Sequence, residues 1–118
     1  MHRDARAYLW DIQKAAEAIE EFIAGMDLRA YSRNEVVDAA VERKFGIIGE
    51  ALVKLSKADP ELASRIPNIR AIIAFRNILI HGYAVVEHQR VWQIAKESLP
   101  GLHAVVASLL VKLGPPDA

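Results

Sequence analysis

The sequence predicts an all-α protein, a single-domain bundle of four to five helices, and three observations support this prediction. Apolar residues recur every three or four positions in four separate stretches, which is the spacing of one helix face. No stretch alternates apolar and polar residues as a half-buried strand does. The 118 residues, 53% hydrophobic and 25% charged, suit one globular domain with a modest core.

The first helix is expected from about Asp4 to Ala24. Its apolar stripe steps by three or four residues through Leu9, Ile12, Ala16, Ile19 and Ile23. Charged residues on the other side, including Lys14 and Glu17, form a face for solvent. Gly25 is a natural terminator, because glycine readily adopts the left-handed conformation that ends many helices.

The second helix is expected to begin at a capping box, Ser32-Arg33-Asn34-Glu35, in which the serine covers one free amide and the glutamate another. A long apolar stripe follows and ends near Lys57. It consists of Val37, Val41, Phe45, Ile48, Leu52 and Leu55. Asp59-Pro60 then predicts a short turn of helix, since proline is well tolerated at the first helical position.

The third long helix is expected to begin after Pro67 and to run to His81, where Gly82 ends it. It is apolar almost all round, through Ile69, Ile72, Ile73, Phe75, Ile78, Leu79 and Ile80. A helix without a solvated face must be covered on both sides. One chain of this length has few spare helices for that purpose, so we infer a second subunit that packs on this helix.

The last helical region is expected from about Glu87 to Leu113, with Pro100-Gly101 breaking or kinking it. The domain then covers residues 1–113, and residues 114–118 form a short disordered tail. The apolar stretch Leu102 to Leu113 is too short to cross a bilayer, so no membrane-spanning segment is expected. The absence of cysteine excludes disulfides and thiol nucleophiles, and we expect a soluble cytoplasmic protein.

The charges of the chain balance, with 15 basic and 15 acidic residues. Nucleic-acid binders usually hold their ligand by neutralising phosphates, and a neutral chain lacks that overall attraction. If the ligand is a nucleic acid, the attraction has to come from a local patch of cations.

Four polar residues at the end of the apolar third helix stand out as candidates for chemistry: Arg76, Asn77, His81 and Tyr83. Asn77 and His81 are four apart and share one helix face, whereas Arg76 points well round the cylinder from His81. The long arginine stem and unwinding of the last turn at Gly82 can bring the two together. Histidine can move a proton near neutral pH, and arginine can stabilise charge on phosphate oxygens. This set suits cleavage of a phosphodiester without a metal, and no spacing of His, Asp and Glu suggests a metal site or any cofactor.

Each of these residues also has a structural interpretation. His81 can cap free carbonyls at the helix end, Arg76 can pair with Glu50, and Tyr83 can be an ordinary core-edge residue. The other histidines, His2, His88 and His103, are scattered and are expected at the surface. The spacing alone leaves both interpretations open.

The run Arg76-Asn77-Ile78-Leu79-Ile80-His81-Gly82-Tyr83 resembles the R-N-x-x-x-H-x-Y signature of HEPN domains, in the form found in the HepT family of toxin–antitoxin modules. The resemblance extends along most of the chain, through Tyr8-Leu9, Asp11-Ile12, Ile48-Gly49-Glu50-Ala51, Ile66-Pro67, Val91-Trp92 and Leu99-Pro100. The chain departs from the family after Pro67, where a tryptophan is common and this sequence has Asn68.

The resemblance implies a HEPN-type helical bundle that dimerises with its two motifs facing each other. It implies a metal-independent endoribonuclease toxin that cuts RNA with Arg76 and His81, assisted by Asn77. The implied partner is an MNT-type nucleotidyltransferase antitoxin, which transfers AMP to the motif tyrosine, here Tyr83. Glu50 matches a recurrent acidic position, with either a structural pairing or a direct role at the site.

A second interpretation belongs to a different functional class. The same resemblance is compatible with a non-catalytic HEPN dimer that binds or regulates a partner nucleotidyltransferase. The intact set of Arg76, His81 and Tyr83 favours the ribonuclease, and the balanced charge of the chain favours the non-catalytic module.

Overall fold

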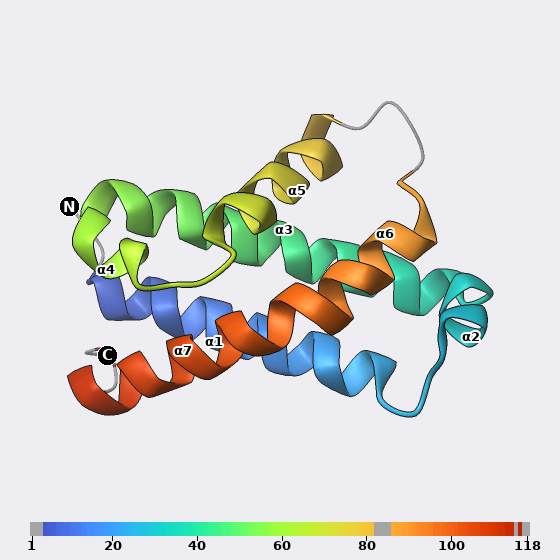
Figure 1. Ribbon diagram of the computed structural model, residues 1–118, viewed down its shortest axis with the longest axis horizontal. Coiled ribbons are helices and arrows are strands. Elements are labelled where there is room, and N and C mark those ends of the chain that lie inside the picture. Colours follow the sequence, from blue (N-terminus) through green and yellow to red (C-terminus); the bar gives the residue numbers. More distant parts are fainter. Residues whose placement is uncertain (1–3, 82–85, 115, 117–118) are drawn as a thin grey trace.

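The computed structural model describes residues 4–81, 86–114 and 116, and helices are the only regular secondary structure in that part of the chain (Figure 1). The elements are α1 (Ala5–Ile23), α2 (Leu28–Ser32), α3 (Glu35–Ala58), α4 (Pro60–Ser64), α5 (Ile69–His81), α6 (His88–Gln93), the π-helical turn η1 (Ile94–Ser98) and α7 (Leu99–Leu113). The four long helical regions and the all-α fold expected from the sequence are confirmed.

Helices α1 and α3 form the centre of the bundle and lie side by side along its long axis (Figure 1). Helix α7 packs on α1, and α5 packs mainly on the other side of α3. The predicted apolar stripes of the first two long helices supply the core, in which Leu9, Ile12, Phe45 and Leu52 are fully buried. The stripe at 3.6-residue spacing was therefore sufficient to predict which face of each of these helices turns inward.

Helix α5 carries the predicted apolar residues, but a single chain does not cover them all. Ile72 and Phe75 are fully buried, and the ring of Phe75 meets the ring of Phe45 edge-on at 5.4 Å between centroids. Ile78 is 43% exposed on the outer side of α5, and Ile80, about 200° round the helix from it, is 52% exposed. The outer side of α5 is thus left open to solvent, with Ile78 as its large apolar residue.

The residue that caps α3 differs from the prediction. Asn34, and not Ser32, is the N-cap, and its side-chain oxygen accepts a hydrogen bond from the amide of Val37 at 3.0 Å. Ser32 instead belongs to the short helix α2, which the sequence analysis missed. Helix α2 begins at Asp27, whose carboxylate accepts from the amide of Ala30 at 2.8 Å. Two capping residues in close succession each start a helix of their own.

Pro100 was expected to break or kink the last helix, yet helix runs continuously from His88 to Leu113 (Figure 1). The turn before the proline is π-helical, and the amide of Leu99 bonds to the carbonyl of Ile94, five residues back. Proline removes one helical donor and crowds the preceding turn. A wider turn accommodates that crowding without ending the helix.

This continuous helix also corrects the expectation that no segment is long enough to cross a membrane. It has 26 residues and a mean hydropathy of 1.3 over its most apolar stretch, enough for a span by length and composition. Its inward residues, among them Val91, Leu99, Leu102 and Val106, are buried in the core shared with the other helices. In this fold the helix therefore serves as an element of the bundle.

Asn68, where the chain departs from the family pattern, starts α5 in a left-handed conformation with φ of 62°. Asparagine tolerates this region better than other residues with a side chain. Its Nδ2 donates a hydrogen bond to the carbonyl of Ser98 at 3.3 Å, in the π-helical turn. Asn68 thus fastens the start of α5 to the last long helix.

Candidate functional site

Gly49 lies where α5 approaches the backbone of α3 most closely. A Cβ atom added to Gly49 would lie 2.5 Å from Cγ of Arg76 and closer still to its Cβ, which no real side chain allows. A glycine inside a helix lowers the stability of the fold by roughly 1 kcal/mol relative to alanine. The close contact with Arg76 explains why a glycine nevertheless occupies the middle of α3. The glycine lets the stem of Arg76 lie directly on α3.

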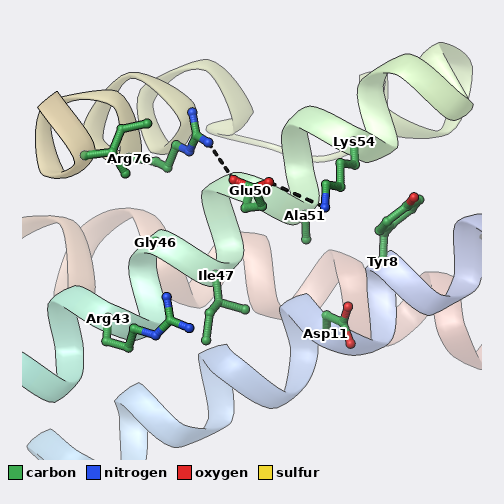
Figure 2. Close-up of a pocket in the computed structure, with 10 residues that line it drawn as sticks. Tyr8, Asp11, Arg43, Gly46, Ile47, Glu50, Ala51, Lys54 and Arg76 are labelled. Atoms are coloured by element: carbon green, nitrogen blue, oxygen red, sulfur yellow. Dashed lines mark hydrogen bonds and ion pairs between the residues drawn. The ribbon is translucent and has the colours of Figure 1, made fainter.

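Arg76 forms an ion pair across this contact with Glu50, the neighbour of the glycine (Figure 2). Nη2 of Arg76 donates to Oε2 of Glu50 at 2.5 Å, and Nζ of Lys54 lies 3.5 Å from the other carboxylate oxygen. The arginine side chain is 19% exposed, whereas that of Glu50 is 47% exposed. The hydrogen bond from Arg76 lowers the pKa of Glu50, so this carboxylate is ionised near neutral pH.

The structure bonds Asn77 to Arg76, whereas His81 is bonded to neither. Nη1 of Arg76 donates to Oδ1 of Asn77 at 3.0 Å. His81 is exposed at the end of α5 and makes no hydrogen bond or ion pair within the described residues. Helix α5 stays regular through His81, which lies five residues and about 140° round the helix from Arg76. The expected unwinding at Gly82 falls outside the described residues, as does Tyr83.

A pocket of about 270 Å³ opens beside the ion pair, between α1, α3 and α5 (Figure 2). It is lined by Tyr8 and Asp11 of α1, by Arg43, Gly46, Ile47, Glu50, Ala51 and Lys54 of α3, and by Arg76 and Ile80 of α5. One further donor of Arg76, its Nε, is buried and has no hydrogen-bond partner. The pocket therefore offers several cations and aromatic and apolar walls to a ligand of nucleotide size.

The close contact at Gly49 could not be predicted from the sequence. Whether Glu50 pairs with Arg76 was open at that level, and the structure contains that pair. Arg43 and Lys54 were not predicted as site residues, because two cations on a long amphipathic helix resemble any solvated face. The sequence does contain one sign of the close contact, which is Gly49 in the middle of a long helix, where helix propensity alone predicts alanine.

No group of three or more His, Asp or Glu side chains capable of holding a metal lies within the part of the chain that the structure describes. A cluster of titratable side chains among the described residues joins α2, α3 and α6. The hydroxyl of Tyr31 donates to Oδ1 of Asp38 at 2.7 Å, and Nε2 of His88 lies 3.2 Å from Oδ2 of the same carboxylate. Glu42 is one turn further along α3, and burial, with the charge of Asp38 adding to it, raises its pKa to about 7.

Two histidines expected as scattered surface residues therefore have structural partners. His88 is bound to Asp38 and meets the ring of Tyr31 edge-on, with 6.1 Å between the ring centroids. His103 lies 2.8 Å from Glu20 and links α7 to α1. The sequence analysis missed both because the partners are distant in the chain. His2 lies outside the described residues.

The raised pKa of Glu42 predicts a pH-dependent stability. Between about pH 4.5 and pH 7 the folded chain keeps the proton of Glu42 and the unfolded chain releases it. The free energy of unfolding is therefore expected to fall as the pH rises through this window. In Glu42→Gln, whose amide mimics the protonated acid, urea unfolding should show a weaker fall and a more stable protein at pH 8. Glu21→Gln on the exposed side of α1 is the control, and an unchanged pH profile in Glu42→Gln would contradict the expectation.

Comparison with known proteins places this geometry in context. The family described as "Ribonuclease HepT-like" matches residues 12–109. "Putative RNase MJ1380" of Methanocaldococcus jannaschii is 33% identical over 100 residues, which cover 83% of this chain and 89% of that protein. "Probable ribonuclease HepT" of Thermococcus cleftensis is 34% identical over 102 residues, 86% of this chain and 92% of its own. No solved structure matches the chain.

Proposed function

Because the chain belongs to the HepT-like ribonuclease family and has the all-α fold of HEPN type, we propose that it is a metal-independent endoribonuclease, the toxin of a toxin–antitoxin pair that acts in the cytoplasm. The observation that carries the proposal is the position of Arg76. Its stem packs on Gly49, and its side chain lines a pocket that contains two further cations, Arg43 and Lys54. A chain with no net charge needs such a local site to attract a polyanion.

In the proposed reaction His81 takes the proton of a ribose 2′-hydroxyl, and that oxygen attacks the adjacent phosphorus. The bond from phosphorus to the 5′ oxygen of the next nucleotide breaks, and the leaving oxygen takes a proton from water, to which His81 later returns the proton that it accepted. Arg76 stabilises the charge that builds on the phosphate oxygens. Asn77 and Glu50 act as positioning residues, since both hold the guanidinium of Arg76.

The test of this function is incubation of the purified chain with RNA in the presence of EDTA. Cleavage is expected to continue, because the reaction uses side chains alone, and the products should end in a 2′,3′-cyclic phosphate. Products with a 5′-phosphate, or activity that disappears on chelation, would point to hydrolysis by a metal-bound water and would overturn the proposal.

The proposed assembly is a homodimer built on the outer face of α5. Ile78 is exposed on this helix, together with Asn77 and His81. A second copy covers Ile78 and brings a second motif next to the first. The separation of His81 from Arg76 within one chain supports this arrangement, since the reacting groups then meet across the interface.

The dimer predicts that Ile78→Asp sediments as a monomer and loses RNA cleavage, because the buried interface cannot accept an unpaired charge. Val111→Asp is the matched control, since Val111 is a more exposed aliphatic residue on a different helix, α7. It should remain dimeric and active. Sedimentation of the wild-type chain as a stable monomer at micromolar concentration would contradict the assembly.

The proposed partner is an MNT-type nucleotidyltransferase that inactivates the toxin by transferring AMP to Tyr83. This residue follows the helix that carries Arg76 and His81, at two positions beyond the histidine. An adenylyl group there adds a phosphate beside two cations that bind phosphates, and its bulk occupies the place of the RNA.

Tyr83→Phe is expected to stay toxic when it is produced together with the nucleotidyltransferase, because it has no hydroxyl to modify. Intact-mass spectrometry should show one or more added AMP units on the wild-type chain and none on the variant. Tyr31→Phe, which removes a hydroxyl outside the pocket, is the control for loss of a hydroxyl elsewhere. An unmodified wild-type chain that is nevertheless silenced would leave occlusion by the partner as the mechanism.

A second candidate function, a non-catalytic dimer that regulates the nucleotidyltransferase, is favoured by one observation. Glu50 already neutralises Arg76, so the arginine also serves as a structural link between α3 and α5. Production of the chain alone in cells separates the two functions. Growth arrest that His81→Ala relieves supports the ribonuclease, and normal growth with the wild-type chain supports the regulator.

A further inference from the structure

The pocket beside Arg76 contains more positive charge than cleavage alone requires. Its lining includes three cationic side chains, those of Arg43, Lys54 and Arg76. Glu50 contacts both Arg76 and Lys54, so these two charges are compensated within the protein. Arg43 makes no hydrogen bond or ion pair with any residue in the described part of the chain. Its side chain is exposed and available to a ligand.

The position of Arg43 on α3 sets its distance from the proposed cleavage point. Arg43, Glu50 and Lys54 follow one another at spacings of seven and four residues, which places them on one face of the helix. Seven residues correspond to about 10 Å along the helix axis. Figure 2 shows Arg43 at one end of the pocket and Lys54 at the other, with Glu50 between them. An RNA strand covers this distance within a few nucleotides.

The chemistry of the side chain points to a phosphate as its ligand. A guanidinium presents a planar fork of donors that matches two phosphate oxygens, and it stays charged at every physiological pH. Two carboxylates line the pocket, Glu50 of α3 and Asp11 of α1, and Glu50 already contacts the other two cations, Arg76 and Lys54. Arg43 has no such partner within the described residues, so its guanidinium is the cation of the pocket that an anion can bind without displacing a carboxylate.

We propose that Arg43 binds the phosphate of a nucleotide next to the cleavage point and so positions the RNA strand across the pocket, an inference that rests on the proposed ribonuclease function. Arg43 is a substrate-positioning residue in this account and takes no part in bond cleavage. A substrate with only one phosphodiester offers nothing to Arg43, because its single phosphate lies at Arg76 and His81.

The experiment compares a dinucleotide, which has one phosphodiester, with a hexanucleotide RNA. On the hexanucleotide, Arg43→Gln is expected to raise KM about tenfold with little change in kcat, the effect of losing one charge-assisted contact. On the dinucleotide the variant should match the wild type. Arg43→Lys should restore part of the hexanucleotide KM, since it keeps the charge and loses the fork. Arg29→Gln, an exposed arginine on α2, is the matched control.

A binding measurement accompanies the kinetics and needs no cleavage. For a 2′-O-methyl hexanucleotide, the plot of log affinity against log salt concentration has a negative slope. Its magnitude should be smaller by about 0.7 in Arg43→Gln than in the wild type, the value for one phosphate contact to a single strand. An unchanged slope, or an equal loss of activity on both substrates, would overturn the role of Arg43. If the wild-type chain cleaves neither the dinucleotide nor the hexanucleotide, the proposed ribonuclease function itself is overturned, whatever the binding result.

Discussion

Replacing Arg76 or His81 with alanine is expected to abolish RNA cleavage while the helical content of the chain stays intact. Loss of a donor to the developing charge typically lowers kcat about 100-fold to 1000-fold. Loss of a positioned acid or base has an effect of about 100-fold to 10,000-fold. His81 is exposed and makes no hydrogen bond or ion pair within the described residues, so its removal breaks no such bond in that part of the chain.

The two variants differ in their expected effect on stability, which gives the comparison its control. Arg76→Ala leaves Glu50 without its partner and opens space against Gly49, so this variant should also unfold at a lower temperature. His81→Ala should keep the unfolding temperature of the wild type. Circular dichroism and single-turnover cleavage measure both effects, with Arg29→Ala, which changes an exposed arginine on α2, as the matched control. Cleavage by His81→Ala at the wild-type rate would exclude proton transfer by this residue.

Gly49→Ala is expected to destabilise the protein and to reduce cleavage, although alanine is the better helix former. The new Cβ would overlap the stem of Arg76, so α5 has to move away from α3. Such overpacking costs about 1 to 3 kcal/mol. Because Arg76 moves with α5, the rate should fall about 100-fold, as it does for misplaced catalytic groups.

Gly46→Ala is the stability control on the same helix, one turn earlier. A Cβ at Gly46 meets nothing within 4 Å, so this substitution should stabilise the protein by up to about 1 kcal/mol in urea unfolding through helix propensity. Gly101→Ala on α7 is the control for cleavage, because Gly46 lines the pocket and Gly101 does not. If Gly49→Ala proves as stable as Gly46→Ala and as active as Gly101→Ala, α5 does not lie on the α3 backbone as described.

Much of the fold could be predicted because its long helices follow simple rules. The stripes through Leu9 and Ile12 and through Phe45 and Leu52 predict the buried faces, and Asp59-Pro60 predicts α4. The errors concern the start of α3, where two neighbouring residues could each act as the N-cap. Asn34 caps α3 because Ser32 is already used within α2, a helix of five residues too short for periodicity to detect.

The candidate site was harder to predict because its contacts join residues far apart in the sequence. The motif located Arg76, Asn77 and His81 on one helix, but Glu50 is 26 residues away from its arginine. The exclusion of a side chain at position 49 depends on how closely two helices pack, a distance that local patterns do not contain. The arrangement of His81 depends on what lies against the exposed face of α5.

That exposed face has a thermodynamic consequence for the helix that carries the motif. Only Ile72 and Phe75 of α5 are buried in the single chain, whereas α1 and α3 each bury six or more residues. Local opening of a helix costs less free energy when fewer apolar contacts hold it, so α5 populates detached states more often than the central helices. A molecule that binds only the docked form of α5 lowers the population of those detached states by mass action. In the proposed homodimer the second copy of the chain is such a molecule, so association would keep α5 docked and fix the positions of Arg76 and His81.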